Sequence, residues 1–298
     1  MTECGKIGSQ PSGCDPFFMR KRYTLSLPRG SIELGQRTAV MGILNVTPDS
    51  FSDGGHYYDR AKAVDRGKEM EEQRADIIDI GGESSRPGSV VVPEEEEIRR
   101  VLPVIEALVP LVKIPISIDT YRASVARLAI EAGAQIVNDI SAFRFDAAMP
   151  RVVCKSRAAA VLMHSRGARE TLHMQTPMQD PVREVMASLE ASAQNARNAG
   201  IAADAIVIDP GIGFGKMADE SLRVLKSLEV FSKLSYPLLV GTSRKSFIRL
   251  ITDESPDARN WGTAATVVAA ILNGAHIVRV HDVRQARALA DMTDRIAD

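Results

Sequence analysis

The chain has 298 residues, of which 45% are hydrophobic and 25% are charged, and its formal net charge is −1. These are the proportions of an ordinary globular protein with enough apolar material for a sizeable core. The single dense basic cluster, residues 20–22, is interpreted as part of a solvated tail, so no nucleic-acid partner is expected.

The three cysteines lie at positions 4, 14 and 154, and their spacing matches neither a disulfide framework nor a zinc site. The first twenty residues are rich in Gly, Ser and Pro and contain no apolar run typical of a signal peptide. The longest uncharged run, residues 262–278, contains Asn273 and His276. We therefore expect a cytoplasmic protein without a membrane span, with a disordered tail at residues 1–20 and one domain at residues 21–298.

In chain order, the first predicted element is a hairpin at residues 23–34. We expect it to close the bottom of the barrel that is predicted below from the following strands and helices. From residue 39 on, short β-rich apolar runs alternate with longer segments of helical periodicity, which is typical of a parallel α/β fold. Strands are predicted at residues 39–46, 76–80, 114–118, 135–140, 159–163, 205–208, 237–241 and 276–280. Helices are predicted between them, among others at 60–73, 94–111, 122–132, 181–199, 221–232 and 282–296.

This alternation matches the size and order of a single (β/α)8 TIM barrel. The alternative is an open doubly wound sheet, which would need a phosphate-binding loop after its first strand. Residues 209–216 (DPGIGFGK) follow the sixth predicted strand instead. They match neither G-x-G-x-x-G nor G-x-x-x-x-G-K-[ST]. We therefore predict the barrel.

Polar residues follow every predicted strand, and in such barrels catalytic groups lie at these C-terminal strand ends. They are Asn45, residues 83–86, Asp119, Asn138 with Asp139, His164, Asp209, residues 242–246, and Arg279 with His281. Taken alone, Asp119 could cap a helix, Asn138 and Asp139 could form a turn, and His164 could be a satisfied buried histidine. Their convergence on one mouth favours a functional site.

The chemistry of these groups predicts a binding site for an anionic heterocycle. Carboxylates and an amide suit a flat heterocycle whose edge offers N–H donors and a carbonyl, and the candidates are Asp119, Asp209, Asn138 and Lys245. Cationic and hydroxyl groups suit phosphate oxygens, and the candidates are Arg279, His281, Arg86 and Ser85. Oxygens in the loop that contains Asn45, Asp49 and Asp53 suit a hard cation such as Mg²⁺.

Seven motifs, in this order, resemble those of dihydropteroate synthases, and the resemblance covers about residues 38–298. They are residues 45–55, 81–88, 117–120 (SIDT), 138–140 (NDI), 209–216, 243–247 (SRKSF) and 279–282 (RVHD). The resemblance implies a transferase of folate biosynthesis and sulfonamide target on a pterin-binding barrel. Such enzymes condense 6-hydroxymethyl-7,8-dihydropterin pyrophosphate with p-aminobenzoate to give 7,8-dihydropteroate and pyrophosphate.

The resemblance also implies roles for individual residues. It assigns the pterin to Asp119, Asn138, Asp209 and Lys245. It assigns the pyrophosphate to Ser85, Arg279 and His281. It assigns p-aminobenzoate to Phe51, Pro87 and Ser246, the Mg²⁺ cofactor to Asn45, and catalysis to Lys245, Arg86 and Asp53. Family members of this kind are expected to be homodimers.

Two departures from the family pattern occur. Ser85 stands where the family usually has threonine, which keeps the hydroxyl, and residues 165–175 differ from the usual Met-x-Gly-x-Pro-x-x-Met-Gln pattern. Two other functions stay open. A pterin-binding methyltransferase with a corrinoid partner would have no need for residues 243–246. A paralogue that binds pterin without turnover is disfavoured by the retention of Arg86, Lys245, Arg279 and His281.

Overall fold

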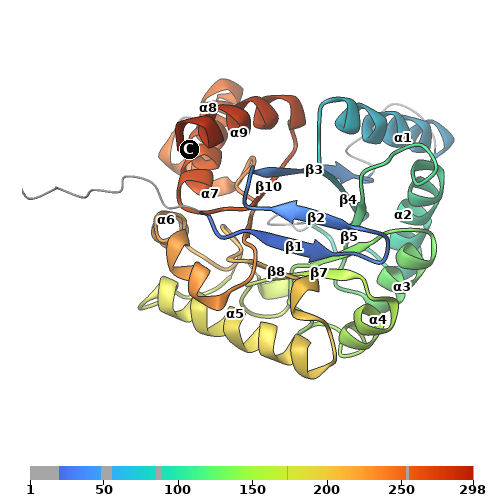
Figure 1. Ribbon diagram of the computed structural model, residues 1–298, viewed down its shortest axis with the longest axis horizontal. Coiled ribbons are helices and arrows are strands. Elements are labelled where there is room, and N and C mark those ends of the chain that lie inside the picture. The colour runs from blue at the N-terminus through green and yellow to red at the C-terminus, as the bar shows by residue number, and fades with distance from the viewer. Residues whose placement is uncertain (1–19, 48–55, 85–88, 173, 253–254, 298) are drawn as a thin grey trace, which may run out of the picture.

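A closed ring of parallel strands surrounded by helices forms the body of the protein (Figure 1). The computed structural model describes residues 20–47, 56–84, 89–172, 174–252 and 255–297. Within these residues the strand order of the 8-stranded sheet is β8-β7-β6-β5-β4-β3-β10-β9. A parallel bridge between Ile208 and Leu238 joins the two outer strands and closes the sheet. The predicted (β/α)8 barrel is confirmed.

Each strand overlaps the apolar run that predicted it. The strands are β3 (Ala39–Asn45), β4 (Ile77–Gly81), β5 (Ile116–Asp119), β6 (Ile136–Asp139), β7 (Ala159–Met163), β8 (Ile206–Asp209), β9 (Leu239–Val240) and β10 (Ile277–Val280). They read as nearly continuous apolar runs because parallel strands in such a barrel are buried on both faces.

Helices cover the outside of the ring. They are α1 (His56–Glu72), α2 (Glu94–Leu108), α3 (Ala123–Glu131), α4 (Met149–Ser156), α5 (Pro181–Asn198), α6 (Ala218–Lys226), α7 (Ser246–Ile251), α8 (Pro256–Leu272) and α9 (Val283–Ala297). Two of them begin at side-chain caps: Asp180 accepts from the backbone of Arg183 before α5, and Ser255 accepts from that of Ala258 before α8. Among the described helices, none is long and apolar enough to cross a bilayer.

Alternate residues of each strand face the barrel interior, and the lowest interior layer is apolar. This floor contains Met41, Ile77, Ile136, Val207 and Ile277, all buried in one cluster. The residues between them, such as Val40 and Ile78, belong to the larger cluster under the helices. Because side chains repeat with a period of two, the next interior layer lies two residues further along each strand.

That next layer is polar. Two residues beyond Ile77, Ile136, Val207 and Ile277 stand Asp79, Asn138, Asp209 and Arg279. The first three have relative exposures of 0%, 4% and 4%. The barrel therefore carries a ring of hydrogen-bonding groups directly above an apolar floor, which is what fixes the position of the site.

The N-terminal hairpin plugs the bottom of the barrel, as predicted. It consists of β1 (Tyr23–Ser26) and β2 (Ser31–Leu34), paired antiparallel. Leu25 and Leu34 are each 1% exposed and belong to the same cluster as the interior floor. Figure 1 shows the two strands lying across the ring.

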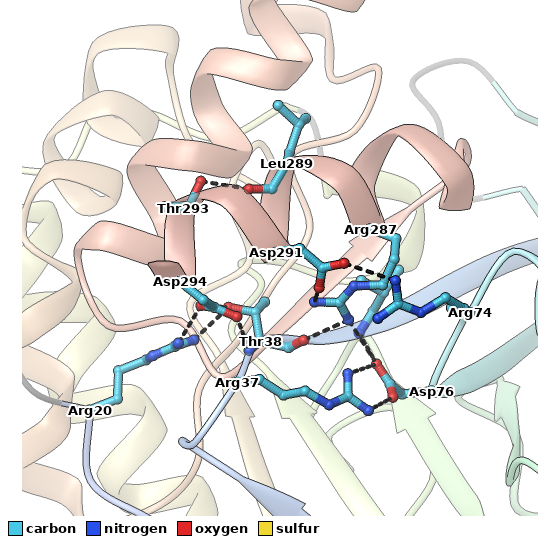
Figure 2. A network of polar contacts seen from close by, with 11 residues as sticks. Arg20, Arg37, Thr38, Arg74, Asp76, Arg287, Leu289, Asp291, Thr293 and Asp294 are labelled. Atoms are coloured by element: carbon cyan, nitrogen blue, oxygen red, sulfur yellow. Dashed lines mark hydrogen bonds and ion pairs between the residues drawn. The ribbon is translucent and has the colours of Figure 1, made fainter. Parts of the chain in front are cut away.

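A network of charged and polar groups next to the hairpin corrects one prediction (Figure 2). Arg20, which we assigned to the disordered tail, has a side chain only 9% exposed. It forms an ion pair with Asp294 of α9 and donates to Thr38 Oγ1 at 2.6 Å. Asp294 also accepts from the backbone N–H of Thr38 at 2.6 Å. The sequence could not show this, because the ion pair joins residues at opposite ends of the chain. The ordered chain thus includes residue 20.

Candidate active site at the barrel mouth

Two adjoining cavities open at the C-terminal ends of the strands. The inner cavity is lined by the pterin candidates and by apolar side chains: Asp119, Asn138, Ile140, Met163, Asp209, Phe214, Lys245 and Arg279. The outer cavity shares some of these residues and adds a polar rim: Asn45, Glu83, Ser84, Ser243, Arg244 and His281. Six of the seven residues predicted to bind pterin or pyrophosphate therefore line the two cavities.

Arg279 connects the strands under the site. Its Nε donates to Asp79 Oδ2 at 2.6 Å, and its Nη2 donates to Asp119 Oδ2 at 2.5 Å. Asp119 does not cap α3: the backbone N–H of Ala123, the first residue of that helix, donates to Asp146 Oδ2 at 2.8 Å. The simpler interpretation of Asp119 as a helix cap is therefore wrong, and its carboxylate belongs to the cavity.

Burial makes the carboxylates of the inner cavity weaker acids. It raises the pKa of Asp119 to about 7, against the attraction of Arg279, and the negative charge of Asp79 raises it further. Burial also raises the pKa of Asp209 to about 6, partly offset by a backbone hydrogen bond and by Lys245. Perturbed carboxylates gathered in a cavity are typical of a functional site.

The turn after β8 uses one oxygen of Asp209 and leaves the other facing the cavity. Asp209 Oδ1 accepts from the backbone N–H of Gly211 at 2.7 Å. Gly211 has φ +63°, and a Cβ there would lie 2.0 Å from the carbonyl oxygen of His164. Only glycine fits this turn, so the motif has a structural part as well as a binding part.

His164 supports that turn and does not bind in the cavity. Its Nδ1 lies 2.7 Å from Lys216 Nζ, which also donates to the carbonyl of Gly211 at 2.8 Å. Burial lowers the pKa of His164 to about 2 and that of Lys216 to about 7. The neutral imidazole therefore accepts from the lysine, which agrees with a satisfied buried histidine.

Lys245 and Phe214 form one wall shared by the two cavities. Lys245 lies directly before α7, and its Nζ is 3.7 Å from the centroid of the Phe214 ring. A cation over an aromatic face is attracted by the ring quadrupole. This contact holds the charged end of the lysine at the point where the pterin candidates meet the outer rim.

The outer rim combines cationic and neutral groups. His281 Nδ1 lies 2.9 Å from Ser243 Oγ, and Ser243 Oγ also accepts from the backbone N–H of His281 at 3.3 Å. Arg244 pairs with Asp282 at 3.0 Å. Together with Arg279, this rim can receive an anionic group that extends out of the inner cavity.

The loop after β7, which departs from the family pattern, braces the loop after β4. Arg169, in the short helix η2 (Arg169–Thr171), donates from Nε to Glu83 Oε1 at 2.7 Å. It also donates from Nη2 to the carbonyl of Ser84 at 2.8 Å. Glu83 additionally pairs with Arg122 at 3.2 Å. The loop after β7 therefore forms an ion pair with a residue that lines the outer cavity.

Several predicted site residues lie outside the described residues, namely Phe51, Asp53, Ser85, Arg86 and Pro87. Ser246 is described, but it is exposed at the start of α7 and does not line either cavity. Phe214 and Asp79 are among the residues that the sequence analysis missed. Phe214 lies within a motif that we recognised for its glycines, and Asp79 is a charge inside an apolar strand, which could have drawn attention to it.

Comparisons with known proteins agree on one family. A family model described as "Pterin binding enzyme" matches residues 41–281. A dihydropteroate synthase of Synechocystis is 45% identical over 91% of this chain and 94% of its own. A solved dihydropteroate synthase of Xanthomonas albilineans with 4-aminobenzoic acid is 41% identical, with a TM-score of 0.83 over 89% of this chain and 95% of that one. A structure from the same organism in complex with 7,8-dihydropteroate is 39% identical, with a TM-score of 0.80 and the same coverages, 89% and 95%.

Proposed function

The chain belongs to the dihydropteroate synthase family of pterin-binding enzymes, and on this premise we propose the reaction that it catalyses. It condenses 6-hydroxymethyl-7,8-dihydropterin pyrophosphate with p-aminobenzoate to give 7,8-dihydropteroate and pyrophosphate. The observation that carries the proposal is the inner cavity, whose hydrogen-bonding wall combines two carboxylates and an amide with the cations of the rim directly above.

The pterin lies in the inner cavity in this proposal. Its edge offers several N–H donors, and Asp119, Asn138 and Asp209 offer acceptors on three neighbouring parts of the wall. Lys245 supplies a donor for the pterin's carbonyl or ring nitrogen. Ile140, Met163 and Phe214 supply the apolar surface that a flat ring requires.

The pyrophosphate lies in the outer cavity, where Arg279 and His281 receive its oxygens. Breakage of the bond between the pterin's methylene carbon and the pyrophosphate oxygen sends the electron pair to the leaving group. The cation-like methylene is then attacked by the amine of p-aminobenzoate, which forms the new C–N bond and loses a proton. This route requires no enzyme nucleophile, so the protein acts by positioning and by charge stabilisation.

Mg²⁺ is part of the proposal, with Asn45 as its protein ligand. Among the described residues, no group of three or more His, Cys, Asp and Glu side chains could hold a metal ion. The neutral oxygen of Asn45 at the outer cavity fits an ion that keeps several waters and shares the oxygens of a substrate phosphate. When bound, the ion neutralises charge on the leaving pyrophosphate.

The remaining site roles are proposed from the family resemblance alone. Phe51, Pro87 and Ser246 frame p-aminobenzoate. Ser85 binds the pyrophosphate, and Arg86 and Asp53 assist the transfer together with Lys245. The cytoplasm is the proposed compartment, since the sequence contains no disulfide framework.

A homodimer is also proposed, through the outer face of three adjacent helices. Leu250 on α7, Trp261 on α8 and Met292 on α9 are 77%, 74% and 64% exposed. Exposed large apolar side chains on helices that contact one another are candidates for an interface. Trp261→Glu is expected to convert the dimer to monomer in light scattering, whereas Leu111→Glu, an exposed residue beyond α2, should leave it unchanged. A monomeric parent protein would contradict the assignment.

A turnover assay tests the central reaction. The parent protein is expected to release pyrophosphate only when the pterin pyrophosphate, p-aminobenzoate and Mg²⁺ are all present. Pterin binding without pyrophosphate release would support the non-catalytic paralogue. Methyl transfer from methyltetrahydrofolate to a corrinoid, without condensation, would support the methyltransferase.

A further inference from the structure

A buried carboxylate lies under the inner cavity, in contact with two of the residues that line it. Asp79 lies on β4 with its side chain 0% exposed. Its Oδ2 accepts from Arg279 Nε at 2.6 Å and from Asn138 Nδ2 at 2.9 Å. Asp79 thus lies behind the wall, in contact with two residues that line the cavity but without lining it itself.

The ion pair with Arg279 determines what Asp79 can do. A guanidinium at hydrogen-bond distance stabilises the ionised form of a buried carboxyl group. An ionised carboxylate has only acceptor oxygens, so any group that faces it must donate. The side-chain amide of Asn138 can satisfy this requirement only by turning its NH₂ group toward Asp79.

This orientation of the Asn138 amide determines where its carbonyl oxygen points. With Nδ2 directed at Asp79, the carbonyl oxygen of Asn138 is left for the inner cavity, where it has no hydrogen-bond partner within the described part of the chain. An asparagine without a fixed partner can rotate and present either a donor or an acceptor. Here the bond to Asp79 holds the amide in one orientation, with its carbonyl oxygen directed away from Asp79.

We propose that Asp79 is a positioning residue that fixes the carbonyl oxygen of Asn138 as an acceptor for an N–H donor of the pterin. This inference rests on the proposed pterin site and deepens it. The wall then presents acceptors from Asp119, Asn138 and Asp209, so it selects a ligand edge rich in donors. A heterocycle with a carbonyl at the Asn138 position is rejected.

Calorimetric titration of 6-hydroxymethyl-7,8-dihydropterin pyrophosphate, with Mg²⁺, tests this in a double-mutant cycle. In Asp79→Asn the side chain can donate as well as accept, so the Asn138 amide is no longer held. We expect Asp79→Asn to weaken affinity by about ten- to a hundredfold. In an Asn138→Ala background the same change should cost at least about threefold less, because the amide that it orients is gone. A smaller difference between the two backgrounds would overturn the proposal.

Asp139→Asn is the matched control. Asp139 is also buried on β6, but it accepts from Ser141 and the backbone of Phe143 in the turn that follows. Its variant should bind the pterin like the parent. Failure of the parent itself to bind pterin would refute the proposed function, whereas a parent that binds no better than Asp79→Asn would refute only the role of Asp79.

A measurement on the parent protein keeps the test decisive if Asp79→Asn does not fold. In protein labelled with ¹⁵N-asparagine, the side-chain signal of Asn138 is identified by its loss in Asn138→Ala. We expect its NH₂ protons to exchange slowly with solvent before any pterin is added, because they face a buried carboxylate. Rapid exchange that slows only on pterin binding would show that the NH₂ group faces the ligand, and would overturn the proposal.

Discussion

Arg279 and Asn45 both line the outer cavity, but they act differently on the leaving group in our account. Arg279 makes charge-assisted contacts, whereas Asn45 contributes a neutral oxygen to a metal ion. Raised Mg²⁺ should therefore partly restore kcat/KM in Asn45→Ala and leave Arg279→Ala unrestored. Steady-state rates over a series of Mg²⁺ concentrations measure this.

Arg279 also neutralises Asp79 and Asp119, so its variant needs a check of folding by circular dichroism. Equal restoration of the two variants would mean that the metal is not held by Asn45.

The raised pKa values of the cavity carboxylates predict a pH dependence of pterin affinity. The pterin's donors require ionised acceptors, and the pKa is about 7 for Asp119 and about 6 for Asp209. Lowering the pH through this window protonates the wall, so affinity should fall progressively as pH drops below about 7. Because both carboxylates line the same cavity and have pKa values near each other, the curve reports their combined titration and not either residue alone.

Calorimetric titrations at a series of pH values measure this curve, with Asp209→Asn as the comparison. In this variant, the part of the fall in affinity that occurs near pH 6 should be missing, because the group with that pKa has been removed. An affinity for the pterin that stays constant across the window would contradict the role of both carboxylates.

At the scale of elements, Arg20 ties the segment before the hairpin to α9 and to the start of β3. The contacts to Asp294 and Thr38 are largely buried (Figure 2). Arg20→Ala removes a hydrogen-bonded charge and is expected to lower the free energy of unfolding by about 1.5 to 3 kcal/mol. Denaturant titration measures this loss.

Two controls isolate the contribution of Arg20. Deletion of residues 1–19 keeps Arg20 and should leave the free energy of unfolding unchanged. Lys21→Ala removes a neighbouring but exposed charge and should likewise leave it unchanged. A loss in the deletion variant as large as that in Arg20→Ala would show that residues before Arg20 stabilise the domain.

For the whole molecule, the barrel could be predicted because its strands and helices have distinct periods and lengths. Ile77 and Ile277 mark strands in the sequence, and polar residues such as Asp209 mark their ends. The bounds of α4, with 8 residues, were not located in the sequence, because so short a helix contains few turns in which periodicity can stand out. The site residues that could be predicted are those at the C-terminal ends of the predicted strands.

What could not be predicted depends on contacts between distant residues. Asp79 and Arg279 are 200 residues apart, and Arg20 and Asp294 are 274 apart. The charge of Asp79 stands out in its apolar strand, but nothing local shows whether its side chain faces the interior or the helices. The direction of a side chain becomes known only when the barrel has closed and its register is fixed.

The account depends most on the claim that the inner cavity binds pterin through acceptor groups, and Asp209→Asn tests it most directly. The backbone N–H of Gly211 requires an acceptor, so the asparagine would keep its oxygen there and turn its NH₂ toward the cavity. That donor would face the pterin's own donors and should cost about 1.5 to 3 kcal/mol, roughly ten- to a hundredfold in affinity. Calorimetric titration of the pterin substrate into both folded proteins measures the difference. Binding within about twofold of the parent would show that the carboxylate only supports the turn and would contradict the pterin site.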